Sequence, residues 1–150
     1  MFRTSFPAIM LSFALLGAHG TMAKASGTAD EARSMLERAV IAVKADQARA
    51  LAAFNAGLDG FRDRDLYVFC NKLDGVTVAH ARPGMLGANL NDEKDPSGKE
   101  FGKEMLSHAR EGEVHAVSYA VPRPGGGQPV PKESYVTRIG DLVCGVGYYK

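Results

Sequence analysis

The feature that most constrains the fold is a long amphipathic pattern near the start of the chain. Thr28 and Glu31 have the spacing of a capping box, in which each side chain accepts a hydrogen bond from the backbone N–H of the other residue. Apolar residues then recur at helical spacing at Ala32, Met35, Leu36, Ala39, Val40, Val43, Leu51 and Phe54. The helix is predicted to end at 55–57, because Gly57 can adopt the left-handed conformation that closes a helix.

A helix of about 28 residues would measure about 42 Å. That is longer than a small domain is wide, so the helix must lie along the outside of the fold, kink, or reach a partner. We expect its apolar stripe to cover one face of a sheet.

The rest of the chain is predicted to be mainly β-structure. The expected strands are 66–70, 76–79, 114–121, 134–139 and 142–149, with a short helix at 99–111. The first two strands should form a hairpin. The Pro/Gly-rich segment 122–131 is too long for a tight turn, so we expect a mobile flap or a lid over a ligand. This order of elements predicts an α+β domain with an antiparallel sheet.

Residues 1–25 have the features of a secretory signal peptide. Arg3 supplies a positive charge, and the apolar run 8–18 has eleven residues, whereas a membrane-spanning helix needs about 20. Ala23-Lys24-Ala25 fits a cleavage site, with cleavage after Ala23 or Gly20 as alternatives. We therefore expect a secreted, periplasmic domain at 26–150. An uncleaved anchor or a buried helix is the alternative.

The charge balance argues against a nucleic-acid partner. The whole chain has 18 basic and 17 acidic residues, and the part after residue 25 has 16 and 17. Neutralising phosphates needs a clustered excess of Lys and Arg, which this composition does not hold.

Cys70 and Cys144 are the only cysteines in the chain. Paired thiols in an oxidising compartment tend to form a disulfide, and closing so long a loop would stabilise the fold by about 4 kcal/mol in the chain-entropy model. Two buried free thiols are the alternative. The chain lacks the C-x-x-C and paired-His spacings of metal and haem sites.

Catalytic motifs are also missing from the sequence. The histidines are scattered, Gly125 to Gly127 has no following Lys-Ser/Thr, and the segment 89–95 lacks the spacing of a calcium loop. We expect neither an enzyme nor a bound cofactor or metal.

Polar aromatic residues are concentrated on the predicted strands. Tyr119 and Tyr135 flank the Pro/Gly-rich segment on adjacent predicted strands, and Lys132 opens the second of these strands. Two hydroxyls and an ammonium at one end of a sheet would suit a small carboxylate, with His80 or Arg82 assisting. Core packing is the alternative for each tyrosine. Gly145 and Gly147 alternate on one face of the last strand, which would leave room against the sheet.

Short motifs follow the predicted helix in a characteristic order. They are 65–70 (DLYVFC), Asp74-Gly75, 78–80 (VAH), 86–90 (LGANL), 95–101 (DPSGKEF), Tyr119-x-x-Pro122, 132–136 (KESYV) and 145–149 (GVGYY). In this order they resemble the single Cache domain, type 2 subgroup, over essentially all of residues 26–150. The resemblance implies a PAS-like five-stranded antiparallel sheet of order 2-1-5-4-3, with the long helix along it. It also implies an extracellular pocket for a small carboxylate or amino acid, as in the sensory parts of chemoreceptors and histidine kinases.

The resemblance also assigns candidate residues and partners. The ligand-binding candidates are Tyr119, Lys132, Tyr135, Tyr67, His80, Arg82 and Met85. The implied strand order places the first and last strands side by side, which supports a Cys70–Cys144 disulfide. Val121 and Ala81 depart from the residues that many relatives have at these positions.

Two functions are therefore expected from the sequence. The first is a free-standing, non-catalytic, ligand-binding sensory domain that acts with a membrane receptor or kinase. The alternative is a ligand-free interaction domain that associates, for example as a homodimer, through its long helix.

Overall fold

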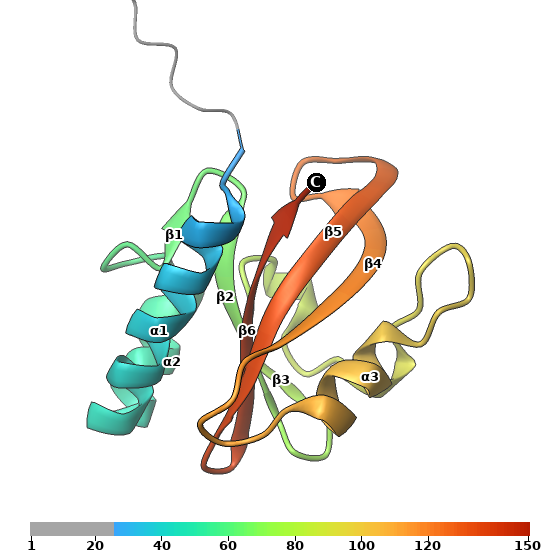
Figure 1. Cartoon of the computed structure of the whole chain (residues 1–150). Helices are drawn as coiled ribbons and strands as arrows, with labels where there is room; N and C mark the ends of the chain where they lie inside the picture. The colour runs from blue at the N-terminus through green and yellow to red at the C-terminus, as the bar shows by residue number, and fades with distance from the viewer. Residues whose placement is uncertain (1–25) are drawn as a thin grey trace, which may run out of the picture.

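A computed structural model describes residues 26–150 (Figure 1). The expected signal peptide at 1–25, with its cleavage near Ala23 or Ala25, lies outside these residues. Helices α1 (Ala29–Ala45) and α2 (Gln47–Ala56) cover one face of an antiparallel sheet, and α3 (Phe101–His108) lies on the other side. The predicted α+β class is confirmed. Within the described chain, no helix is long and apolar enough to cross a membrane.

The N-terminal helix begins as predicted but is divided into two. The Thr28 and Glu31 side chains form the capping box. The prediction of one helix to residue 55 was wrong, because Asp46 has an extended backbone (φ −160°, ψ 98°) and separates α1 from α2. Its carboxylate accepts from Arg49 N at 3.0 Å and caps α2, an interaction that competes with continuation of a helix. The second helix ends at Gly57, with φ +67°.

The sheet is built from six strands. They are β1 (Arg62–Asp63), β2 (Leu66–Lys72), β3 (Thr77–Ala79), β4 (His115–Arg123), β5 (Gly126–Ile139) and β6 (Leu142–Tyr149). The pairing runs β3–β2–β6–β5–β4, and the short β1 pairs with the beginning of β2. Apart from β1, this is the order that the family resemblance implies. Two short 3₁₀ helices, Pro83–Met85 and Leu90–Asp92, lie between β3 and α3.

The Pro/Gly-rich segment 122–131 is a strand hairpin, so the predicted flap or lid was wrong. Arg123 at the end of β4 pairs with Gly126 at the start of β5. The carbonyl of Pro131 accepts from Lys150 N, on the β6 side of β5. The ring nitrogens of Pro131 and Pro129 therefore face that side as well, and neither removes a donor from the pairing with β4.

Alternation along the central strand β2 supplies both layers of the core. Val68 and Cys70 face α1 and α2 and join a cluster that contains Leu36 and Phe54. Tyr67 and Phe69 face the opposite side, with Val117, Val136 and Met105. Each face of β2 is thus covered, and the side that holds Tyr67 is the one that faces α3.

Cys70 and Cys144 form a disulfide on the helical side of the sheet. They are direct register partners on β2 and β6, with 4.1 Å between their Cα atoms and 74 positions between them in sequence. The disulfide expected from the sequence is confirmed.

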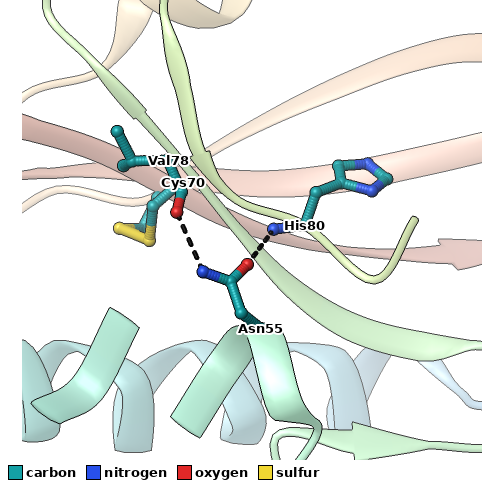
Figure 2. Close-up of a disulfide and its surroundings, with 5 residues drawn as sticks. Asn55, Cys70, Val78 and His80 are labelled. Atoms are coloured by element: carbon teal, nitrogen blue, oxygen red, sulfur yellow. Dashed lines mark hydrogen bonds between the residues drawn. A yellow bond between two sulfur atoms is a disulfide. The ribbon is translucent and has the colours of Figure 1, made fainter. Parts of the chain in front are cut away.

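Asn55 at the end of α2 connects the helical layer to β3. Its Nδ2 donates to the carbonyl of Val78 at 3.1 Å, and its Oδ1 accepts from the backbone N–H of His80 at 3.0 Å. Figure 2 shows Asn55 reaching the strand close to the disulfide, while the His80 ring points away from the helices. These two hydrogen bonds fix the backbone on both sides of the end of β3, at Val78 and at His80.

Removal of the disulfide is expected to lower the free energy of unfolding by about 4 kcal/mol, because the unfolded chain regains the entropy of a long open loop. The measurement is urea unfolding of a Cys70→Ala/Cys144→Ala variant beside the wild type, each with and without dithiothreitol. Dithiothreitol should destabilise the wild type and leave the variant unchanged. Equal stability of the reduced and oxidised wild-type protein would contradict this expectation.

Candidate ligand-binding site

A cavity lies between the α3-facing side of the sheet and the segment that connects β3 to α3. Its volume is about 50 Å³, room for a few water-sized groups. Its lining comprises Tyr67, Phe69, Asn71, Thr77, His80, Arg82, Met85, Leu90, Glu93, Phe101, Met105, Tyr119, Val121 and Lys132. Six of the seven candidates from the sequence are in this set, and Tyr135 is outside it.

Lys132 is the most unusual residue of the cavity. Its side chain is 1% exposed, although it belongs to β5 and reaches across β6 to β2. Gly147 permits this path, because a Cβ at that position would collide with Cε of Lys132. The ammonium donates to Tyr67 Oη at 3.0 Å and lies 4.4 Å and 4.7 Å from the ring centroids of Tyr67 and Tyr149.

The Lys132 ammonium has no anionic partner in the part of the chain that the structure describes. The ion pairs found among residues 26–150 do not include it. An ammonium has three donors, and only the bond to Tyr67 occupies one of them. A buried charge is costly unless it is paired, so the cavity presents a cation that favours an anion.

Tyr119 contributes a neutral hydroxyl to the same region. Burial raises the pKa of Tyr119 well above its usual range, so the group stays protonated. Its Oη and Ser134 Oγ are 2.8 Å apart, and its ring stacks on Phe101 with 4.1 Å between centroids. These two contacts hold the ring in place against α3.

His80 is held neutral in the wall of the cavity. Burial lowers its pKa to about 3, and the positive charges of Arg82, Lys132 and Arg62 act in the same direction. Its Nδ1 lies 3.0 Å from the backbone nitrogen of Arg82, which donates to it. The neutral ring therefore carries its proton on Nε2, and His80 acts as a hydrogen-bond donor without adding charge.

The charged groups of the cavity favour a negative ligand. Arg82 is exposed, and Glu93 is partly buried. With His80 neutral, the lining has two cations, Lys132 and Arg82, against one carboxylate. Among the described residues, no group of three His, Cys, Asp or Glu side chains could hold a metal ion.

The structure places Tyr135 on the opposite face of the sheet, which corrects its assignment to the site. Its ring lies 5.9 Å from that of Tyr148, and Arg33 of α1 is 5.8 Å from its centroid. Lys132 and Tyr135 are three positions apart on β5, and side chains alternate between the faces of a strand. They therefore cannot contribute to the same pocket.

The remaining lining residues were not among the candidates from the sequence. Phe69 and Asn71 follow Tyr67 at alternate positions of β2, so their common face was available as a signal. Phe101 and Met105 form the apolar face that the sequence predicts for the short helix. The loop residues Leu90 and Glu93 carry no comparable pattern.

The chain belongs to the Cache domain family. The family model dCache_2, described as a Cache domain, matches residues 35–150. This range contains the sheet, α2, α3 and every residue that lines the cavity. The family expected from the sequence motifs is confirmed.

Relatives of this chain include chemotaxis proteins. Over 75 residues the chain is 35% identical to the methyl-accepting chemotaxis protein McpP of Pseudomonas putida. The matched segment is 49% of this chain and only 14% of that protein. The structure also resembles a solved periplasmic sensor domain of a chemotaxis protein, with a TM-score of 0.62 and 29% sequence identity. The similar region covers 80% of this chain and 88% of that one.

A third relative was solved in connection with ligand recognition. It is a Cache chemosensory domain studied for carboxylic acid recognition, with a TM-score of 0.59 and 27% identity. The similarity covers 77% of this chain and 84% of that one. The domain described here is thus homologous to the sensor domains of chemotaxis receptors.

His80 should make the protein less stable as the pH falls. Its pKa is about 3 in the folded protein and 6.5 ordinarily, so between these values the unfolded chain binds a proton that the folded protein does not. The free energy of unfolding should therefore fall by up to about 1.4 kcal/mol per pH unit below pH 6.5.

The measurement is chemical unfolding of the wild type and a His80→Gln variant between pH 7 and pH 5. This window avoids Glu31 and Glu133, whose pKa values move from 4.5 to about 2 on folding. The wild type should show the steeper loss of stability. Parallel curves would show that His80 is not held neutral.

Proposed function

We propose that this protein is an extracytoplasmic sensor that binds a small carboxylate or amino acid without catalysis. The observation that carries the proposal is the buried ammonium of Lys132, which faces the cavity with no acidic partner among the described residues. A carboxylate is an anion of suitable size, and a charge-assisted hydrogen bond to it would compensate the buried charge.

The neighbouring groups suit the same ligand. His80 offers a neutral donor, and Arg82 adds a second positive charge toward solvent. Aromatic and apolar walls from Phe69, Phe101 and Met105 exclude water from the short carbon chain of such an acid. The relative studied for carboxylic acid recognition is consistent with this ligand class.

The proposed setting is the periplasm, and the proposed partner is a membrane receptor or kinase. A disulfide suits an oxidising compartment, and the relatives include a periplasmic sensor domain of a chemotaxis protein. In this proposal the domain detects the ligand, and a membrane protein passes on the signal.

A second candidate is association through α1. Ile41 on this helix is 69% exposed, and an exposed apolar residue favours contact with another surface. A single such residue is weaker support than an unpaired buried charge, so carboxylate binding remains our principal proposal.

Replacement of Lys132 by Met should weaken carboxylate binding by about thirtyfold or more, because a buried charge partner is lost. Isothermal titration calorimetry with a panel of short monocarboxylates and amino acids measures this. The matched control is Lys103→Met, the same chemical change at an exposed position of α3, and this variant should bind like the wild type.

The stability of the ligand-free variants separates binding from a structural role. Removal of an unpaired buried charge should leave the free energy of unfolding of Lys132→Met unchanged or raise it by about 1 kcal/mol. A variant that unfolds more easily and still binds the acids as tightly as the wild type would contradict the proposal.

A further inference from the structure

Asn71 has an unusual side chain among the residues that line the cavity. It belongs to β2, is 2% exposed, and lines the cavity. Among residues 26–150, its Oδ1 is the only buried side-chain nitrogen or oxygen without a hydrogen-bond partner. Buried polar atoms are nearly always paired, so this acceptor requires an explanation.

The orientation of the Asn71 amide follows from its neighbours. Nδ2 donates to the carbonyl of Gly75 at 3.3 Å and to Thr77 Oγ1 at 2.7 Å. A backbone carbonyl can only accept, so the amide nitrogen must face the turn at Gly75. Oδ1 is thereby directed away from the turn and left without a donor, in a residue that lines the cavity.

Asn71 and Lys132 mark two polar ends of one cavity. Tyr67 and Asn71 lie on the same face of β2, four positions apart, so their Cα atoms are separated by about 13 Å. The Lys132 ammonium lies over the Tyr67 ring. Phe69 lies between them on that face. A cavity lined by a cation beside Tyr67, an acceptor on Asn71 and the apolar ring of Phe69 between them suits an unbranched ligand with two different polar ends.

We propose that the ligand is a short linear carboxylate that carries a hydrogen-bond donor, a hydroxyl or an amino group, at the end remote from the carboxylate. Oδ1 of Asn71 accepts from this donor and makes Asn71 a specificity-determining residue. This inference rests on the proposed function, because it takes the carboxylate to be bound at Lys132.

The physical basis is the cost of leaving a buried acceptor unpaired. Oδ1 is already shielded from water in the described structure, and a methyl group placed against it would offer no hydrogen bond. A hydroxyl or amino group would satisfy it. A site built around a hydrogen bond therefore rejects the analogue that lacks the donor, and here we expect about a tenfold difference in affinity.

The experiment compares matched pairs of acids by calorimetry on the purified protein. Each pair consists of an unsubstituted acid and its terminally hydroxylated analogue, from acetate and glycolate through propionate, butyrate and pentanoate with their ω-hydroxy forms. The ω-amino acids of the same lengths form a second arm, which identifies which donor is preferred. At the length that spans the cavity, a donor-bearing acid should bind about ten times more tightly than its unsubstituted partner.

Two variants assign this preference to Oδ1. Asn71→Leu removes the acceptor and should abolish the difference within each pair while unsubstituted acids still bind. Gln128→Leu is the matched control, because it removes a side-chain amide at an exposed position of β5 outside the cavity lining, so the preference should survive.

The outcomes separate this inference from the function on which it rests. Equal binding within every pair of the wild type, or a preference that persists in Asn71→Leu, would overturn the role of Asn71. Neither result would affect carboxylate binding at Lys132. Failure of every acid to bind would instead overturn the proposed function.

Discussion

The register between β2 and β6 is the constraint on which the remaining structure depends. The two strands lie at the centre of the sheet, with Cys70 opposite Cys144. A slip of one residue would exchange the two faces of β2, placing Tyr67, Phe69 and Asn71 against the helices and Val68 and Cys70 in the cavity. The disulfide excludes this alternative, because it joins positions that are adjacent only in the observed register.

The same register positions two glycines that shape the site. Gly145 lies beneath Phe69, and Gly147 lies beneath the stem of Lys132. Without their small size, neither side chain could lie across β6. The space that the sequence suggested at these glycines is therefore filled by the side chains of Phe69 and Lys132. This path across β6 lets Lys132 reach Tyr67 on β2. The resulting buried charge weakens the case for a purely structural role, since an apolar residue would pack there at lower cost.

Much of the fold follows from sequence patterns because those patterns are local. The capping box at Thr28, the hairpin after β2, and the alternation on β6 depend on neighbouring residues. The break at Asp46 was missed because the apolar periodicity continues on both sides of it. The hairpin at 122–131 was missed because prolines and glycines were weighed without the pairing partner that accommodates them.

The site was predictable only where strand boundaries were right. The fourth expected strand was bounded at residue 134, and Lys132, which was taken to open it, was grouped with Tyr135 without regard to the alternation of side chains along a strand. The observed β5 contains both residues, and alternation then separates them. Nothing local indicates that Asn71 has an unpaired oxygen, since this depends on the turn at Gly75 and on the walls of the cavity.

The central claim is that a carboxylate occupies the cavity and is held by Lys132. A crystal structure of the protein with its tightest-binding acid tests this most directly. The account predicts a carboxylate oxygen within hydrogen-bonding distance of Lys132 Nζ, at about 2.8 Å, with the carbon chain directed along Phe69 toward Asn71. An acid bound elsewhere on the surface, with the Lys132 ammonium still bonded only to Tyr67, would contradict it.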